Sequence, residues 1–223
     1  MVRFVEDIAM HSFSRGIGTC VYRTSWCLKN CYANKFYAMG WAREEWDKVD
    51  DDWWQASGVG DIRQEIWDAN KGQPPARFRF SIKGEIWTTE EDVLKVDDII
   101  TRMPDTIFWI PTRAWQDSAM QEIIEEVVLD RANARVMASL DPSTADAYTI
   151  NYLRERGWSI LYVGHNEDQE QQLLTETGDT EENLTEGMFR CPKTWEGKLG
   201  HCAICTEGCF SEKRVDVQLR KHK

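Results

Sequence analysis

Seven cysteines are the residues of this 223-residue chain best suited to chemistry, and they fall into two groups near its two ends. No cysteine lies between Cys31 and Cys191. Disulfide scaffolds usually contain even numbers of cysteines spread along small secreted domains, so an odd number in two tight groups favours metal ligation. The candidate ligands are Cys20, Cys27, Cys31, Cys191, Cys202, Cys205 and Cys209.

The N-terminal group occupies a loop in which Cys20, Cys27 and Cys31 are separated by six and three residues. Gly16 and Gly18 give this loop the freedom to bend around a compact ion or cluster. Three thiolates leave one coordination position unfilled: a zinc ion would need a fourth ligand or water, and a 4Fe-4S cluster would keep one iron free. The spacing therefore predicts an open site that can bind a small molecule.

The C-terminal group has ten, two and three residues between Cys191, Cys202, Cys205 and Cys209. Four thiolates can fill a tetrahedral site, and structural zinc sites and auxiliary iron–sulfur clusters both use a close CxxC pair with two outlying cysteines. The spacing therefore leaves zinc and iron open at this end. Two further interpretations are one cluster shared between the two ends and, for each thiol, a small buried hydrophobic side chain.

The segment between the cysteine groups alternates between short apolar runs and helical patterns, which is typical of successive strand–helix units with a parallel sheet. Strands are expected over residues 7–13, 77–82, 107–111, 134–140, 158–163 and 187–190. Helices are expected over residues 34–46, 52–70, 90–103, 117–132, 143–157 and 167–177, with a proline-containing loop at 71–75. The predicted fold is α/β, an incomplete parallel (β/α)6 barrel with helices outside, and a flat doubly wound sheet is the alternative.

Functional groups of parallel α/β folds collect where the carboxyl ends of the strands meet their loops. This rule places Lys83, Gly84, Glu85, Arg113 and Asp141 at one mouth, together with the three-cysteine loop and the start of the C-terminal cysteine group. Glu85 and Asp141 can hold an amine or move a proton, and Arg113 can bind a carboxylate or phosphate through its planar fork. The ordinary alternatives are a polar loop residue, a helix cap and a surface salt bridge, respectively.

Two histidines and an acidic triplet are weaker candidates. His165 follows an expected strand and His201 lies beside the C-terminal cysteines, so each can serve as a metal ligand or a proton carrier. Asp50, Asp51 and Asp52 are expected to form a solvated helix start and not a metal site.

Short motifs along most of the chain carry a resemblance to a known family. They are Gly18-Thr19-Cys20, Trp26-Cys27, Cys31-Tyr32-Ala33, Lys83-Gly84-Glu85, Trp109-Ile110-Pro111-Thr112-Arg113, Ala138-Ser139-Leu140-Asp141 and the run from Cys191-Pro192 to Cys205. Together they resemble the phage "gene product 88" family. The resemblance implies an iron–sulfur protein located in the cytoplasm of the phage host.

The order of these motifs is also similar to that of radical SAM enzymes, whose partial barrel carries three cluster cysteines in the loop after its first strand. This similarity implies that Tyr32 is the aromatic residue beside the last cluster cysteine. It further implies that Lys83, Gly84 and Glu85 bind the methionine amino group of SAM and that the C-terminal cysteines hold an auxiliary cluster. The cysteine spacing is wider than is usual in those enzymes, and Lys83 replaces a glycine of their motif.

Composition narrows the range of partners and sets the expected domains. The 27 Lys and Arg against 38 Asp and Glu give a net charge of −11, which argues against nonspecific binding to a nucleic acid backbone. No apolar run approaches the roughly 20 residues of a membrane helix, and no signal peptide pattern is present, so a cytoplasmic location is expected. A partial barrel over residues 1–190 is expected, with the cysteine-rich segment 191–223 packed on it.

The expected function is therefore that of an iron–sulfur protein with one or two 4Fe-4S clusters, in which an open iron binds a small-molecule substrate. SAM is one candidate for that molecule, and the sequence leaves open whether the protein is an enzyme. The alternatives are a noncatalytic iron–sulfur or zinc-binding redox sensor or adaptor that binds a host protein, and a structural protein held together by zinc.

Overall fold

The structure is a computed structural model of the 223-residue chain. It describes residues 1–31, 33, 42–164, 180–197, 202, 204–211 and 214–220. The expected helix over residues 167–177 and most of the one over 34–46 lie outside the described residues, as do His165, His201 and Tyr32.

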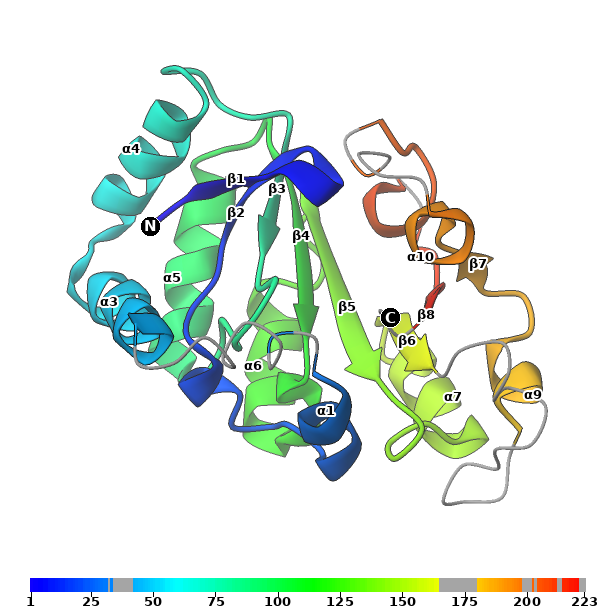
Figure 1. Ribbon diagram of the computed structural model, residues 1–223. Helices are drawn as coiled ribbons and strands as arrows, with labels where there is room; N and C mark the ends of the chain where they lie inside the picture. Colours follow the sequence, from blue (N-terminus) through cyan, green and yellow to red (C-terminus); the bar gives the residue numbers. More distant parts are fainter. Residues whose placement is uncertain are drawn as a thin grey trace.

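Eight strands of the described chain form one sheet in the order β1-β2-β3-β4-β5-β6-β8-β7 (Figure 1). β1 pairs with β2 antiparallel, and every other pair is parallel. The strands are β1 Arg3–Val5, β2 Met10–Phe13, β3 Arg77–Phe80, β4 Ile107–Thr112, β5 Ala134–Leu140, β6 Ser159–Gly164, β7 Phe189–Arg190 and β8 Val217–Arg220. The predicted α/β class and parallel strand order from β2 to β6 are confirmed. The sheet is open, and a radical SAM-like barrel stays a prediction.

One correction concerns the strand expected at residues 187–190, which forms as β7 but does not pair with β6. β8, a strand that the sequence did not predict, lies between them and pairs parallel with both. The C-terminal cysteine-rich segment therefore supplies a strand of the sheet. Hydrogen bonds from Phe189 N to Asp216 O (2.8 Å) and from Cys191 N to Gln218 O (3.1 Å) join this segment to β7.

The helices of the described residues are α1 Ser25–Asn30, α3 Ala42–Ala56, α4 Val59–Ala69, α5 Glu90–Thr101, α6 Ser118–Val127, α7 Ala147–Glu155, α9 Glu181–Thr185 and α10 Pro192–Glu196. Most of these helices cover one face of the sheet, whereas α1 lies at the strand ends and α10 lies with the C-terminal segment (Figure 1). The single helix expected over residues 52–70 is wrong. α3 ends at Ala56, and α4 begins after Gly58, whose N–H donates to the Asp61 carboxylate at 3.0 Å and so starts a new helix.

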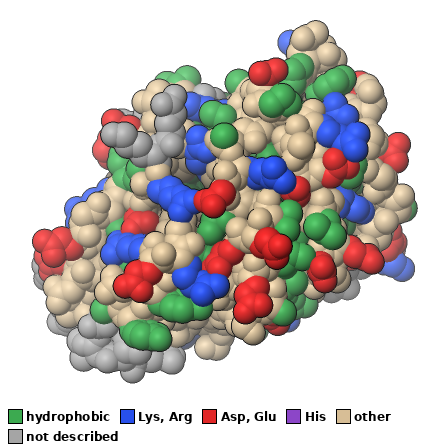
Figure 2. Space-filling model, turned by 180° about the vertical axis from the view of Figure 1, so that it is seen from behind, with side chains coloured by type: hydrophobic (Ala, Val, Ile, Leu, Met, Phe, Trp, Pro, Cys, Tyr) green, Lys and Arg blue, Asp and Glu red, His purple; other side chains and the backbone are tan. Residues whose placement is uncertain are grey.

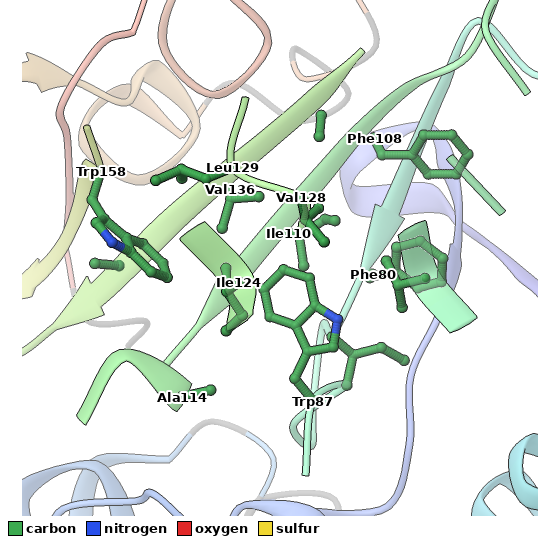
Figure 3. Packing of buried hydrophobic residues seen from close by; sticks show 14 of the residues in the cluster. Phe80, Trp87, Phe108, Ile110, Ala114, Ile124, Val128, Leu129, Val136 and Trp158 are labelled. Atoms are coloured by element: carbon green, nitrogen blue, oxygen red, sulfur yellow. The ribbon is translucent and has the colours of Figure 1, made fainter. Parts of the chain in front are cut away.

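Two apolar clusters lie on opposite faces of the sheet because successive strand residues point to opposite sides. On β4, Phe108 and Ile110 belong to the cluster under the helices, whereas Trp109 belongs to the other. Figure 3 shows Trp87, from the loop after β3, and Ile124, from α6, in the helix-side cluster. Full burial of one such side chain contributes about 1.5–3 kcal/mol, so this cluster is a main source of the stability of the fold.

The second cluster lies under the C-terminal segment. Trp109, Met137 and Leu161 from β4, β5 and β6 pack there with Phe210 and Val217 from the segment that follows Cys202. The Trp109 and Phe210 rings meet edge to face, with 5.8 Å between their centroids. The cysteine-rich segment thus covers the face of the sheet that lies opposite the helix-side cluster. We call this face of the sheet the inner face.

The surface in Figure 2 carries basic and acidic side chains interspersed, with no large area of one sign. Ion pairs at the surface of the described residues include Arg131 with Asp97 (2.7 Å) and Arg156 with Glu125 (2.5 Å). Among the described residues, no helix has the length and apolar character needed to cross a membrane.

Candidate metal centre

The three-cysteine loop leaves the end of β2 and is shaped by two threonines. Thr19 Oγ1 donates to Gly16 O (2.8 Å) and accepts a hydrogen bond from the backbone N–H of Glu85 (2.9 Å). Thr24 Oγ1 accepts from the N–H of Cys27 at 2.9 Å and thereby caps α1. The loop is therefore attached to the segment that follows β3, and Cys27 lies in the first turn of a capped helix.

The Lys83-Gly84-Glu85 segment packs directly against this loop. Gly84 has a φ of 72°, and a Cβ atom there would lie 2.5 Å from Arg15 O, so only glycine fits this approach. The Lys83 ammonium forms an ion pair with Asp47 of α3, whose carboxylate also accepts from Ile17 N at 3.2 Å. The sequence suggests Lys83 and Gly84 for cofactor binding. In the structure, Lys83 forms an ion pair and Gly84 packs closely against the backbone of Arg15.

The three thiols of the loop lie near one another. Burial, together with the charges of Glu85, Cys27 and Cys31, raises the pKa of Cys20 to about 12. Burial also raises the pKa of Cys27, although the adjacent Arg113 guanidinium opposes this through its charge and a hydrogen bond. Metal ligation would have to displace the thiol protons, which makes binding at this site dependent on pH.

The donor chemistry fits a thiophilic metal or cluster, but the ligand geometry is not preformed. Within the described parts of the chain, no three His, Cys, Asp or Glu side chains lie close enough together to hold a metal ion. The Cys20, Cys27 and Cys31 side chains would therefore have to turn towards a common centre. Cys27 lies on a six-residue helix, and Cys31 directly follows it.

Glu85 joins the ends of β3 and β4. Its Oε2 accepts from the backbone N–H of Arg113 at 2.9 Å, and its Oε1 accepts from the N–H of Trp87 at 3.3 Å. Burial raises the pKa of Glu85 to about 7, because desolvation outweighs these hydrogen bonds, which lower it. The carboxyl group therefore titrates near neutrality while it holds the two strand ends together.

Arg113 and Asp141 form a buried ion pair across the ends of β4 and β5. Arg113 Nη2 lies 2.8 Å from Asp141 Oδ2, and the Asp141 side chain has no exposed surface. Thr24 Oγ1 donates to the same Oδ2 at 2.6 Å, and Ser143 donates to Oδ1 through its N–H (2.9 Å) and its hydroxyl (2.6 Å). The structure therefore brings together the ends of three neighbouring strands and the three-cysteine loop, as the sequence predicts, while the chemical roles of these residues stay predictions.

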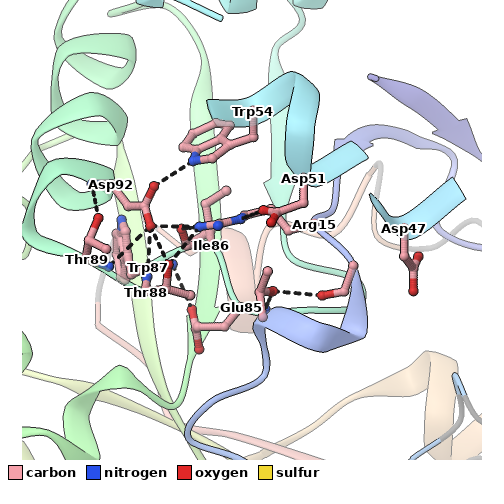
Figure 4. A network of polar contacts seen from close by, with 12 residues as sticks. Arg15, Asp47, Asp51, Trp54, Glu85, Ile86, Trp87, Thr88, Thr89 and Asp92 are labelled. Carbon is pink, nitrogen blue, oxygen red and sulfur yellow. Dashed lines mark hydrogen bonds and ion pairs between the residues drawn. The ribbon is translucent and has the colours of Figure 1, made fainter. Parts of the chain in front are cut away.

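A buried polar network supports this edge and was missed by the sequence analysis (Figure 4). Arg15 pairs with Asp92 of α5 (2.7 Å) and Asp51 of α3 (2.6 Å), and it donates to Ile86 O at 3.2 Å. Trp54 Nε1 donates to Asp92 at 2.7 Å. Burial by itself would raise the pKa of Asp92, but the hydrogen bond from Trp54 and the charge of Arg15 lower it below its ordinary value.

The expectation of a solvated helix start at residues 50–52 is wrong, because these residues lie inside α3. Asp50 is buried and pairs with the N-terminal amine and with Arg3, both at 2.9 Å. Charge alone could not reveal this, since the partners lie far away in the sequence. Thr24 was also missed, although the sequence carried a local signal for its role. It directly precedes the helix Ser25–Asn30, which is the position where a capping threonine typically lies.

The four-thiol group lies on the inner face of the sheet. Cys191, Cys202 and Cys209 pack against the apolar cluster of that face. Burial raises the pKa of Cys209 well above its ordinary value, and the charges of Cys191, Cys202 and Cys205 act in the same direction, whereas Arg79 lowers it. Cys209 therefore lies within electrostatic reach of the other three thiols, although no three of the described thiols are placed to hold a metal ion.

Arginines from the strands hold the backbone of this segment. Arg77, the first residue of β3, donates to Cys202 O at 2.8 Å, and Arg135, the second residue of β5, donates to Ser211 O at 2.6 Å.

The three-cysteine loop instead contacts residues that follow the carboxyl ends of the strands. Figure 1 accordingly shows α1 and α10 well apart. The two cysteine groups occupy different parts of the sheet, in contrast to the single mouth and the shared cluster considered from the sequence.

Comparison with known proteins places the chain in a family. No curated protein matches it. The family model described as "Gene product 88" matches residues 5–218, a range that includes both cysteine groups and every strand from β2 to β7. The chain therefore belongs to the gene product 88 family, as its motifs suggested.

Proposed function

We propose that this chain is an iron–sulfur protein whose Cys20, Cys27 and Cys31 hold a cluster with one iron open to a small molecule. The observation that carries the proposal is the grouping of three mutually interacting thiols beside the buried Arg113–Asp141 pair, at the edge of the sheet where parallel α/β proteins place their sites. Both the soft donors and the missing fourth thiol suit an iron–sulfur cluster.

The positive charge of Arg113 suits a thiolate-bound centre at this site. A cluster held by thiolates carries net negative charge, and the guanidinium beside Cys27 would offset part of it. When bound, the cluster would supply an iron that acts as a Lewis acid or passes electrons. The residues of the chain would hold and orient the ligand: Arg113 by its charge, and Glu85, with its pKa of about 7, by giving or taking a proton.

The four-thiol group suits a second, closed site. Three of its cysteines pack against apolar side chains, and four thiolates leave no position for a substrate. A metal there would join β7, the segment 202–210 and β8, because Cys191 directly follows β7 and Cys209 precedes β8. This second site would be structural, with zinc or a second cluster as its occupant.

The decisive experiment is the measurement of iron, sulfide and zinc per chain after purification without oxygen. We expect equal amounts of iron and sulfide, about four of each per cluster, and a brown colour that bleaches on reduction. Cys27→Ser should remove the cluster of the three-thiol site, and Cys205→Ser the metal of the four-thiol site alone. Val21→Ala and Ile204→Ala, exposed neighbours of the two groups, are the matched controls. A colourless wild-type protein with zinc alone or with no metal would contradict the proposal.

SAM is the candidate small molecule that the resemblance to radical SAM enzymes supports. Reduction of the cluster in the presence of SAM should then release 5′-deoxyadenosine. An intact, reducible cluster that yields no such product would restrict the protein to non-radical chemistry with another ligand.

A second candidate function is that of a noncatalytic adaptor for a host protein, and an exposed aromatic pair on α7 favours it. Tyr148 is 80% exposed and stacks on Tyr152 with 6.3 Å between ring centroids. Exposed tyrosines are enriched at protein interfaces. Under this function, a host partner should bind in a pull-down, remain bound to Cys27→Ser and be lost with Tyr148→Ala. If the partner were instead lost with Cys27→Ser but retained by Tyr148→Ala, its binding would depend on the cluster.

A further inference from the structure

The exposed side of α7 carries a stack of three side chains that ends in solvent. Tyr148 and Tyr152 stack with 6.3 Å between their ring centroids and 14° between their planes, and the Arg156 guanidinium lies 5.5 Å from the Tyr152 centroid. Residues four apart follow one another along one side of a helix, so the stack runs in the order Tyr148, Tyr152, Arg156. Tyr148 is its open end, and 80% of this residue is exposed.

The stack is held in place by contacts with α6. The Tyr152 hydroxyl donates to Gln121 Oε1 at 3.4 Å, and Arg156 Nη2 pairs with Glu125 Oε2 at 2.5 Å. Gln121 Nε2 also donates to Glu125 Oε1 at 2.8 Å, which joins the two contacts. Side chains that are already oriented lose less freedom when a partner binds. The Tyr148 ring is therefore presented to solvent on a prearranged support.

Exposed carboxylates lie around this stack. Glu122 of α6 is exposed, and its charge acts on Arg156. Glu155 is exposed and follows Tyr152 by three residues, so the two side chains are neighbours on α7. Within the described parts of the chain, neither glutamate is in an ion pair, whereas Arg154 and Arg156 both pair with carboxylates. The surface therefore carries negative charge that the chain itself does not neutralise.

We propose that Tyr148, Tyr152, Glu122 and Glu155, which we call the tyrosine surface, bind an arginine-containing segment of another protein. A guanidinium on the open face of Tyr148 would repeat the contact that Arg156 makes with Tyr152, and the exposed carboxylates would pair with it. This inference rests on the second candidate function, that of an adaptor, and it requires no metal.

Charge distinguishes this occupant from two others. Single-stranded nucleic acid also stacks its bases on tyrosines, but its phosphates would meet carboxylates here. A second copy of the chain, related by a two-fold axis, would bring the same carboxylates together. A cationic protein segment complements both the tyrosine surface and the net charge of −11 of the chain.

The test uses three blocked peptides that differ in one repeated residue. Peptides of four Gly-Arg, Gly-Lys or Gly-Gln repeats are titrated into the full chain labelled with ¹³C in its tyrosine rings. The ring signals of Tyr148 and Tyr152 are identified from their phenylalanine variants. We expect the arginine peptide to shift these two signals saturably, the lysine peptide to bind more weakly, and the glutamine peptide to leave both signals unchanged.

Substitutions on the tyrosine surface test its residues, with the dissociation constant taken from the Tyr152 signal. Tyr148→Ala should weaken binding of the arginine peptide about threefold, the effect of one exposed cation–π contact, and Tyr148→Phe should retain it. Replacing Glu122 and Glu155 together by Gln should weaken binding similarly and reduce its dependence on salt. Leu94→Ala, at an exposed position of α5, is the matched control and should bind as the wild type does.

Equal binding of the arginine and glutamine peptides by the wild-type protein would overturn the inference, as would unchanged binding by Tyr148→Ala. Tighter binding of an oligothymidylate than of the arginine peptide would assign the surface to nucleic acid and also overturn it. Self-association that is lost with Tyr148→Ala would do so in favour of a second copy.

Failure of the adaptor function gives a different result. In that case the pull-down retains no host protein, while the peptide titration still decides which chemistry the tyrosine surface prefers. Conversely, a host protein that is lost with Tyr148→Ala but binds through a segment without arginine or lysine would preserve the adaptor function and overturn this inference.

Discussion

The two cysteine groups are attached to the same sheet by different physical interactions. The three-thiol loop is surrounded by charged and hydrogen-bonded groups, chiefly Glu85 and the Arg113–Asp141 pair. The four-thiol group is surrounded by apolar side chains and by arginines stacked on rings, such as Arg77 at 4.9 Å from the centroid of Phe210. The first environment can orient a polar ligand, whereas the second packs the C-terminal segment onto the sheet.

This contrast extends to what holds each group in place. The edge that carries the three-thiol loop depends on Arg15, which forms a buried ion pair with Asp92 of α5, pairs with the partly exposed Asp51 of α3, and donates to Ile86 O after β3. The inner face depends on packing between Phe210 and Trp109. We therefore expect substitutions in one region to leave the metal content of the other unchanged.

Arg15→Met should have the largest effect, because it leaves Asp92 buried without its guanidinium partner. Breaking such a pair lowers the free energy of unfolding by about 3–5 kcal/mol. Urea denaturation measures the loss, and Arg102→Met, which removes the exposed partner of Asp98, is the control with little expected change. Equal stability of these two variants would show that the buried pair does not support the edge.

Phe210→Ala should lower the free energy of unfolding by about 3 kcal/mol, since it removes a buried ring from the inner face. The metal proposed for the four-thiol group should be lost, while the iron proposed for the three-thiol site should remain. Ile204→Ala, at a position that is 75% exposed, is the control. Loss of both metals in Phe210→Ala would break the proposed independence of the two regions.

Glu85 should make the stability of the edge depend on pH. Its pKa is raised from an ordinary value of 4.5 to about 7, so between these values the folded protein binds a proton that the unfolded chain has released. The contribution is complete below pH 4.5 and is lost as the pH rises through 7, by at most roughly 3 kcal/mol. Urea denaturation of chelator-treated protein at pH 5 and pH 8 should show this loss, and Glu85→Gln should remove it. Glu91→Gln, at an exposed position, should behave as the wild type.

Thr24→Val should have the smallest effect, about 1 kcal/mol, because it removes the cap of α1. It also removes the hydrogen bond to Asp141, so the cluster should be released faster on exposure to a chelator. Thr180→Val, which removes the cap of α9, should cost similar stability without affecting the cluster. Identical cluster release in the two variants would restrict Thr24 to a structural role.

Much of the fold could be predicted from local pattern. Residues 107–111 and 134–140 form apolar runs of strand length, and β4 and β5 occupy those positions because both faces of these strands are buried. The short strand β8 was not predicted, since four residues with mixed polarity carry little periodic signal. The separation of α3 and α4 was also missed, because the apolar pattern continues across the interruption at Gly58.

Part of the candidate site could be predicted as well. The rule that functional groups follow the carboxyl ends of parallel strands correctly brought Glu85, Arg113 and Asp141 to one edge. The ion pair of Arg113 with Asp141 and the role of Arg15 could not be predicted, because each depends on side chains that lie dozens of residues away along the chain.

The sequence by itself determined the ligand atoms available to a metal, the spacing of the thiols and the alternation that produces a parallel sheet, since these depend only on residue type and local period. Only the tertiary structure decided that the two cysteine groups lie apart and that Arg113 meets Asp141. The reason is that strand order and register bring distant residues together, and β8 takes its place between β6 and β7 through pairings that no local pattern encodes.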